Sequence, residues 1–211
     1  SADDIIRAGA GSDIIHFNGG NDELYGEDGD DYFYNNASGY AKFDGGSGSD
    51  TVSTSAREDN PFIVDLVSGY FGSPTEISDP RYDTLVSIEN FVVDTDADVT
   101  MLGNQDDNIL ESDSGNDILE GGSGNDTLNA GSGDDHLIGG EGADRFELST
   151  GHDVVRDFNP IEGDLIEVAD PDLVRFSPSS LGVTLSLEGS RGSLLLESVS
   201  SEELIGYDIV V

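Results

Sequence analysis

The chain is a strong polyanion of 211 residues, with 45 acidic and 8 basic side chains and a formal net charge of −37. This charge excludes proteins that bind nucleic-acid phosphates or anionic membrane surfaces, because those contacts need Lys and Arg. The absence of Cys excludes disulfide frameworks and Cys-based zinc sites. No apolar run approaches the ~18 residues of a membrane span, and the N-terminus lacks the basic and apolar regions of a cleavable signal peptide.

So high a charge opposes compaction unless something neutralises it. Of the acidic residues, 30 are Asp and 15 are Glu, and 28 further residues are Gly. Asp and Gly together favour turns, whereas disordered acidic segments are typically rich in Glu. The composition therefore indicates a folded chain whose loops hold cations.

Residues 1–53 carry a nine-residue repeat and form the first block. Each copy has an Asp followed two residues later by a large apolar residue, except that 35–43 lacks the Asp. The pairs are Asp4 with Ile6, Asp13 with Ile15, Asp22 with Leu24, Asp31 with Phe33 and, after the gap, Asp50 with Val52. The glycines expected in the loops are Gly9, Gly11, Gly20, Gly29, Gly46 and Gly48.

Residues 54–101 form a connector of different composition. The pattern predicts a strand over 62–66, a turn at Gly69, and a further strand, or the approach to the next block, over 83–93. About 50 residues bury too little core for a separate catalytic domain. We therefore expect the connector to interrupt the repeats while remaining on the same axis.

Residues 102–167 form the second block, where the repeat is clearest. Three consecutive units, 121–129, 130–138 and 139–147, follow the pattern G-G-x-G-x-D-x-U-x, in which U is a large apolar residue. In a looser copy before them Gln105 replaces a loop glycine and Glu111 is an insertion. The Asp residues of the block, each two residues before Ile109, Leu119, Leu128, Leu137, Phe146, Val155 or Ile166, are Asp107, Asp117, Asp126, Asp135, Asp144, Asp153 and Asp164. Its loop glycines are Gly115, Gly122, Gly124, Gly131, Gly133, Gly140 and Gly142.

The composition of one unit predicts its conformation. Six Gly-rich residues make a loop that visits positive φ, and the last three make a short strand with its middle side chain inward. Two units would close one coil with two strands, and successive coils would stack into two parallel sheets. Because each unit buries only one apolar side chain, no coil would be stable alone.

Stacking would also bring loop carbonyls and Asp carboxylates together. Carboxylates placed one above another repel, so we expect a hard cation with oxygen ligands among them. Calcium accepts irregular sets of carbonyl and carboxylate ligands, whereas magnesium demands stricter octahedral geometry and is the weaker candidate. We expect several calcium ions, held by the Asp residues and loop glycines of the two blocks.

Residues 168–211 are predicted to close the roll. The segment 183–187 alternates apolar and polar residues, 188–192 predicts a turn, and 194–196 is apolar again, so we expect a β-hairpin. Such a hairpin would cap the open end of the roll, which otherwise exposes sheet edges and core.

On these motifs the chain resembles the repeats-in-toxin (RTX, haemolysin-type calcium-binding) family. The resemblance implies an all-β fold, a right-handed parallel β-roll in two blocks with a C-terminal hairpin cap. It also implies that each calcium lies between loops two units apart, held by position-six Asp carboxylates and loop carbonyls. The implied pairs are Asp4 with Asp22, Asp13 with Asp31, Asp107 with Asp126, Asp117 with Asp135, Asp126 with Asp144, and Asp135 with Asp153.

Further segments carry related resemblances. The connector, with its Ser-Ile-Glu-Asn run at 87–90, is similar to the segment that joins repeat blocks in the family, and 146–168 resembles the closing coils of the serralysin C-terminal domain. Asp208 followed by three apolar residues resembles the export signal of serralysin-like substrates of type I secretion, although an ordinary edge strand would also fit. On this interpretation Val211 is the natural C-terminus, and Ser1, which lies within a repeat, begins the C-terminal piece of a longer protein.

The motifs of several enzyme classes are missing from the sequence. None of the three histidines belongs to an H-E-x-x-H zinc motif, there is no G-x-S-x-G motif, and the glycines fit neither dinucleotide nor phosphate loops. An EF-hand beginning at Asp94 is disfavoured because Val99 stands where Gly is required, which leaves a plain turn or a peripheral calcium site. We expect no catalytic residue in this chain, and any catalytic domain would lie upstream of Ser1.

The expected function is that of a calcium-binding module, secreted from bacteria without a cleaved signal peptide. It would fold outside the cell on binding calcium and support the type I secretion and stability of a larger protein, with the secretion machinery as partner through the C-terminus. One alternative is an adhesion module that binds polysaccharide or a cell surface, for which Tyr25, Tyr32, Tyr34 and Tyr40 could form an aromatic platform. Another is the non-catalytic module of a secreted protease or alginate epimerase.

Overall fold

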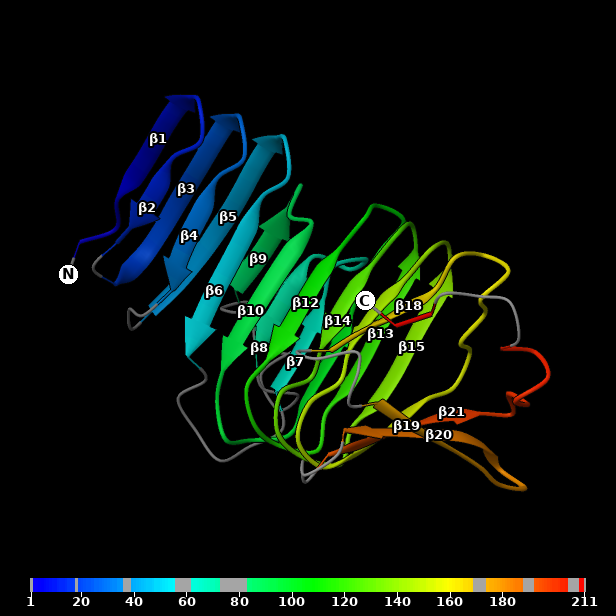
Figure 1. Cartoon of the computed structure of the whole chain (residues 1–211). Helices are drawn as coiled ribbons and strands as arrows, with labels where there is room; N and C mark the ends of the chain where they lie inside the picture. The colour runs from blue at the N-terminus through cyan, green and yellow to red at the C-terminus, as the bar shows by residue number, and fades with distance from the viewer. Residues whose placement is uncertain are drawn as a thin grey trace.

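The computed structural model describes residues 2–17, 19–35, 39–55, 62–72, 83–168, 174–187, 192–204 and 209–210. These residues form strands, bridges and turns but no helix, and therefore no helix that is long and apolar enough to cross a membrane. They coil into a β-roll in which two sheets face each other along the length of the molecule (Figure 1). The expected all-β roll of stacked parallel coils is confirmed.

The described strands belong to two sheets of unequal size. Sheet A contains thirteen strands, in the spatial order β1 (Ile5–Ala10), β3 (Gly20–Asp28), β5 (Gly39–Ser47), β9 (Asp83–Val86), β8 (Tyr70–Gly72), β7 (Phe62–Asp65), β11 (Val99–Leu102), β13 (Ile118–Ser123), β15 (His136–Glu141), β17 (His152–Val155), β21 (Ser193–Glu197), β20 (Gly182–Leu187) and β19 (Val174–Pro178). Sheet B contains eight, in the order β18 (Leu165–Glu167), β16 (Arg145–Glu147), β14 (Thr127–Asn129), β12 (Ile109–Ser112), β10 (Asn90–Asp94), β6 (Thr51–Ser55), β4 (Tyr32–Asn35) and β2 (Ile14–His16).

In the regular coils the chain alternates between the sheets, so neighbouring strands are parallel and hold residues of the same repeat position side by side. Leu119 pairs with Leu137 in sheet A, and Leu110 pairs with Leu128 in sheet B. These apolar side chains point into the space between the sheets and are at most 1% exposed. The core is therefore a double column of one apolar side chain per unit, as the repeat predicts.

The connector widens sheet A but not sheet B. In sheet B a single strand, β10, pairs with both β6 and β12. In sheet A the strands β9, β8 and β7 all lie between β5 and β11, and β8 runs antiparallel to its two neighbours. The strand expected over 62–66 is present as β7, and Gly69 makes the expected turn with a φ of 71°. The segment 83–93 is not one strand: β9 and β10 lie in opposite sheets, because a tight turn at Ser87 divides them.

Aromatic side chains fill the core where sheet A is wider. The ring of Phe71, on the inserted strand β8, lies 5.8 Å from the ring of Phe43 in the first block and 4.9 Å from that of Phe91 in sheet B. Phe43 also packs edge-on against Phe33, at 5.7 Å. Large rings are needed here because two extra strands on one side increase the volume between the sheets.

The C-terminal residues close one end of the roll. The expected hairpin is present as β20 and β21, which pair antiparallel, and β21 extends sheet A by pairing with β17. A third strand, β19, pairs with β20, and the resulting three-stranded meander lies at the end of the roll in Figure 1. On the other side the backbone N–H of Ile166 donates to the carbonyl of Ile209, at 2.7 Å, so the chain end covers the edge strand of sheet B.

Candidate metal centre

The residues at position six of the repeat, two before each inward apolar residue, stack into two rows along the roll. The sheet-A row lies just before the strands of sheet A or within their first residues, and it includes Asp4, Asp22, Asp83, Asp117, Asp135 and Asp153. The sheet-B row precedes the strands of sheet B and includes Asp13, Asp31, Asp50, Asn108, Asp126, Asp144 and Asp164. Except in the first coil, the Asp side chains of both blocks in these rows are at most 4% exposed.

One carboxylate oxygen of each buried Asp binds the backbone of the preceding coil. In the sheet-B row the N–H of Asp126 donates to Oδ1 of Asp144 at 2.9 Å, and that of Asp144 donates to Oδ1 of Asp164 at 3.0 Å. The sheet-A row repeats the bond from Asp117 to Asp135 at 2.7 Å and from Asp135 to Asp153 at 3.2 Å. In the first block the same bond joins Asp4 to Asp22 and Asp13 to Asp31, both at 2.8 Å. Each coil is thus hydrogen-bonded to the next through its acidic row as well as through its strands.

The second carboxylate oxygen is buried and has no hydrogen-bond donor. Among the described residues this holds for Oδ2 of Asp22, Asp31, Asp50, Asp117, Asp126, Asp135 and Asp144. A buried polar atom without a partner costs free energy, and for a charged group the cost is larger. Seven such atoms in regular array indicate that a positively charged group belongs beside them.

Backbone carbonyl oxygens of the next coil lie close to some of these unpartnered Oδ2 atoms. A Cβ placed on Gly121 would overlap Oδ2 of Asp126 and come within 2.7 Å of the carbonyl oxygen of Gly139. A Cβ on Gly26 would likewise overlap Oδ2 of Asp31 and come within 2.6 Å of the carbonyl oxygen of Gly45. At both points a carboxylate oxygen and a carbonyl oxygen therefore face one small space between successive coils.

The expected loop glycines provide the close approach that this arrangement needs. Every loop glycine predicted from the sequence for the two blocks has positive φ. Gly140 has a φ of 102°, and a Cβ on it would overlap the carbonyl oxygen of Gly122 one coil earlier. Any side chain there would thus be strained in conformation and would also push the stacked loops apart.

Burial shifts the titration of these carboxyl groups. Desolvation raises the pKa of Asp126 from 3.8 to about 7, although the N–H of Asn108 partly opposes the shift and the charges of Asp144 and Asp107 add to it. Desolvation also raises the pKa of Asp117 and of Asp164 to about 6, and it raises the pKa of Asp135. In the absence of a cation these four buried carboxyl groups therefore keep their protons to a higher pH than an Asp with the ordinary pKa does.

The chemistry of this donor set fits a hard cation. The buried oxygens are carboxylates and backbone carbonyls, which are the ligands that calcium takes in flexible geometry. Within the described part of the chain no three His, Asp or Glu side chains converge on one point, so carbonyls would have to complete any coordination sphere. Within the described residues this excludes a metal site made of side chains alone, and it agrees with a site in which backbone carbonyls of the stacked loops are also ligands.

The sequence matches the model of one known protein family. The model of the RTX calcium-binding nonapeptide repeat matches four times, over residues 1–24, 18–37, 89–119 and 120–155. The chain belongs to the RTX family. These matches span about half of the sequence, in the first block and from the end of the connector through most of the second block, and the resemblance expected from the nonapeptide is confirmed.

We also compared the chain with curated proteins and with solved structures. No curated protein matches this RTX chain. Among solved structures, the extracellular lipase LipA from Serratia marcescens is similar over 100% of the chain, with 21% sequence identity and a TM-score of 0.38. The chain spans 38% of the length of that lipase.

The register of the RTX repeat differs from our expectation at Asp107. The inward residue of β12 is Leu110, whereas Ile109 is 41% exposed, so position six is Asn108. It is the N–H of Asn108, at 2.8 Å, that donates to Oδ1 of Asp126, and the expected pair of Asp107 with Asp126 does not form. With this register Glu111 is not an insertion and Gln105 does not replace a loop glycine, because 103–111 is a regular unit of nine.

Asp107 belongs instead to an outer row at position five. Its Oδ1 accepts the N–H of Asn125 one coil later, at 2.7 Å. Asp98 accepts the N–H of Asn116 in the same way, at 2.8 Å, which gives this segment the role of a plain repeat turn rather than part of an EF-hand. Exposed carboxylates in this row bind the following coil, whereas the buried carboxylates of position six bind the preceding coil.

Two acidic residues of the inner rows were not predicted from the sequence. Asp83 accepts the N–H of Ala41 at 2.6 Å and so binds the preceding coil, in which 35–43 has no Asp. Glu89 accepts the N–H of Asp50 at 2.8 Å in the same manner. The signal for both was present, since each lies two residues before an inward apolar residue, Leu85 and Phe91. The surrounding loop, however, has no glycine pattern.

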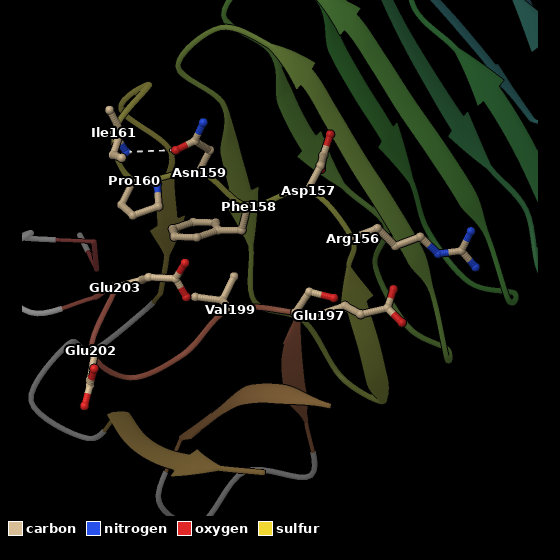
Figure 2. A pocket seen from close by; sticks show the side chains of 11 residues that line it. Arg156, Asp157, Phe158, Asn159, Pro160, Ile161, Glu197, Val199, Glu202 and Glu203 are labelled. Carbon is tan, nitrogen blue, oxygen red and sulfur yellow. Dashed lines mark hydrogen bonds between the residues drawn. The ribbon is translucent and has the colours of Figure 1, made fainter. Parts of the chain in front are cut away.

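A cavity of about 580 Å³ lies elsewhere, between residues 156–161 and 197–203 near the end of the roll (Figure 2). Phe158 and Val199 form part of its wall, with the acidic Glu197, Glu202 and Glu203 around it. Glu203 is already bonded to the N–H of Ser200 at 2.7 Å, within the local turn. We assign no chemistry to this cavity.

Proposed function

We propose that this RTX chain is a module that folds outside the cell on binding several calcium ions, and that it supports the type I secretion and stability of a larger secreted protein. The observation that carries the proposal is the array of buried Asp Oδ2 atoms without donors, of which those of Asp31, Asp50 and Asp126 lie beside a carbonyl oxygen of the next coil. The ligands we propose are the position-six Asp residues of the two inner rows together with the carbonyls of the loop glycines.

The buried rows make the fold depend on a counter-ion. Removing an ionised carboxylate from water costs several kcal/mol unless an opposite charge compensates it. Bound calcium would supply that charge, and at a hundredfold excess over its dissociation constant each site adds about 2.7 kcal/mol. A few such sites equal the whole stability of an ordinary domain, which is about 5–15 kcal/mol.

The same dependence suits a secreted protein. Extracellular calcium modules bind with dissociation constants of about 10⁻⁴–10⁻³ M, far above the calcium concentration of a cytosol. Inside the cell a chain with a net charge of −37 would therefore remain an expanded polyanion, suitable for passage through an export channel. Folding at the exit would oppose return of the chain and assist the protein joined to it.

Circular dichroism tests the metal dependence. We expect a coil-like far-UV spectrum in chelator, a β spectrum in millimolar calcium, and little change with equal magnesium because its coordination is stricter. A β spectrum that persists in excess chelator at neutral pH would contradict the proposal.

The secretion role is tested at the chain end. Asp208 and Val211 lie outside the described residues, whereas Ile209 and Val210 lie against Ile166 at the edge of sheet B. Deletion of residues 208–211 should abolish export from a cell with the cognate type I machinery, while the purified truncation still folds with calcium because its carboxylate rows are complete. Normal export would contradict the signal, and loss of calcium-induced folding would make the segment a structural cap.

The alternative of a polysaccharide-binding platform is not favoured. Tyr25 lies on β3 and Tyr40 on β5 of sheet A, whereas Tyr32 and Tyr34 lie on β4 of sheet B, so the four tyrosines do not share a surface. The ring of Tyr34 stacks on His16, with centroids 4.5 Å apart, which covers one of its faces. We infer that the module itself is non-catalytic; a parent protease, epimerase or other secreted protein is compatible with it.

A further inference from the structure

The connector crosses to sheet B through an unusually short loop. Inward residues of regular units are nine apart, but Leu85 on β9 and Phe91 on β10 are only six apart. Ser87 makes the turn with a φ of 49°, and Ile88 is buried at 3% exposure. This loop has none of the glycines of the nonapeptide, so the repeat pattern assigns no metal to it.

Glu89 nevertheless occupies the position of a repeat Asp. It lies two residues before the inward Phe91, and its Oε2 accepts the N–H of Asp50 at 2.8 Å. Asp50 itself accepts the N–H of Asp31 at the same distance, through Oδ1. The side chain of Glu is one methylene longer than that of Asp, and this length allows it to reach the preceding coil from the shortened loop.

The oxygens of a regular interval are reproduced between Asp50 and this loop. Asp50 is 0% exposed and its Oδ2 has no hydrogen-bond partner. A Cβ on Gly45 would overlap both Oδ2 of Asp50 and the carbonyl oxygen of Ser87. In the second block the corresponding point above Gly121 is bordered by Oδ2 of Asp126 and the Gly139 carbonyl. The Ser87 carbonyl therefore stands where a loop glycine carbonyl stands elsewhere.

The following interval is different. Asn108 replaces the acid, and its amide is fully bonded: Oδ1 accepts the N–H of Asn104 at 2.8 Å, and Nδ2 donates to the carbonyl of Glu89 at 2.7 Å. Both polar atoms of the Asn108 amide therefore have a hydrogen-bond partner, and Asn108 leaves no oxygen that needs a cation. Of these two intervals, as far as the structure describes them, the one between Asp50 and Glu89 holds the oxygen without a donor.

We propose that Asp50, Glu89 and the Ser87 carbonyl form a further calcium site, in which the shortened connector loop supplies a Glu and a Ser carbonyl where a regular unit supplies an Asp and a loop glycine carbonyl. The inference rests on the proposed function, because it requires a chain that binds calcium. Such a site would join the first block directly to the coil that leads into the second.

Calcium stoichiometry of the full chain tests the site. Glu89→Gln keeps the size of the side chain and an oxygen acceptor for the Asp50 N–H but removes the charge. At a calcium concentration that saturates the wild type, we expect this variant to bind one ion fewer in equilibrium dialysis. The matched control is Glu111→Gln, on the neighbouring strand β12 of sheet B, which should bind as many ions as the wild type. Equal numbers for all three chains would overturn the proposal.

A second variant distinguishes loss of the calcium site from loss of folding. Glu89→Asp preserves the net charge but is too short for the position, so we expect it to retain the calcium-induced β spectrum and to require at least tenfold more calcium to fill its last site. An unchanged titration for this variant would also overturn the proposal. If the wild type itself binds no calcium, the proposed function fails; if it binds calcium and the Glu89 variants match it, only the connector site fails.

Discussion

At the scale of single residues, the two oxygens of each position-six Asp have different roles. In Asp126, Oδ1 ties its coil to the N–H of Asn108, and Oδ2 faces a carbonyl-lined space without a donor. The first role needs only an acceptor, whereas the second needs a negative charge and a cation. A substitution that separates acceptor from charge should therefore separate folding geometry from metal binding.

Asp126→Asn makes that separation. The amide oxygen can still accept the Asn108 N–H, so we expect the calcium-saturated variant to reach a native-like β spectrum. Its calcium midpoint should be higher, with a loss of about 3 kcal/mol of stability at a hundredfold excess of calcium, because at least one site loses its charge. Urea unfolding in calcium measures the loss, and Asp113→Asn, at an exposed loop position of the same block, is the control. Matching calcium midpoints for the two variants would contradict the assignment.

At the scale of elements, the inserted strands of the connector hold the two blocks in one core. Phe71 on β8 is 2% exposed and contacts rings from the first block and from sheet B. Few other side chains link three elements in this way, and none of these contacts is specified by the nonapeptide.

Phe71→Ala should consequently be costly. Truncation of a buried Phe leaves a cavity and typically costs about 3–5 kcal/mol. We expect a decrease of that order in the free energy of unfolding, measured with urea in saturating calcium, and a higher calcium midpoint. Phe176→Ala on β19, where the ring is 48% exposed, should change stability much less. Similar losses for the two variants would show that the connector core does not couple the blocks.

The elements differ in how far the sequence predicts them. The units at 121–147 are fully determined by local pattern, because glycines, Asp and the inward apolar residue all agree. At 103–111 the pattern was ambiguous, since Asp106 and Asp107 are adjacent and Ile109 and Leu110 are both apolar, so the register was assigned one residue too early. The insertion of β7 and β8 into sheet A could not be predicted at all. It depends on pairing between segments far apart in sequence, to which the repeat period gives no guide.

At the scale of the whole molecule, the buried rows couple the fold to protons as well as to metal. The pKa of Asp126 is raised in the folded chain to about 7 from an ordinary 3.8. A raised carboxyl pKa stabilises the metal-free fold at low pH, and this contribution is lost as the pH rises through about 7.

The metal-free chain should therefore gain β structure on acidification from pH 8 to pH 5, as measured by far-UV circular dichroism in chelator. Asp126→Asn should weaken this pH dependence, because an amide is neutral at every pH. A metal-free spectrum that remains coil-like across this range would contradict the coupling between protons and the rows.

The unequal sheets have a consequence for the path of the roll. Between the coil of β5 and β6 and the coil of β11 and β12, sheet A spans four strand spacings but sheet B only two. At about 4.8 Å per spacing, sheet A is longer by roughly 10 Å over this stretch. Two surfaces joined along their length but unequal in length must curve, with the longer one on the outer arc. The axes of the two blocks are therefore inclined to each other. A domain joined rigidly to one end of the roll would point in a direction that is not in line with the axis of the other block.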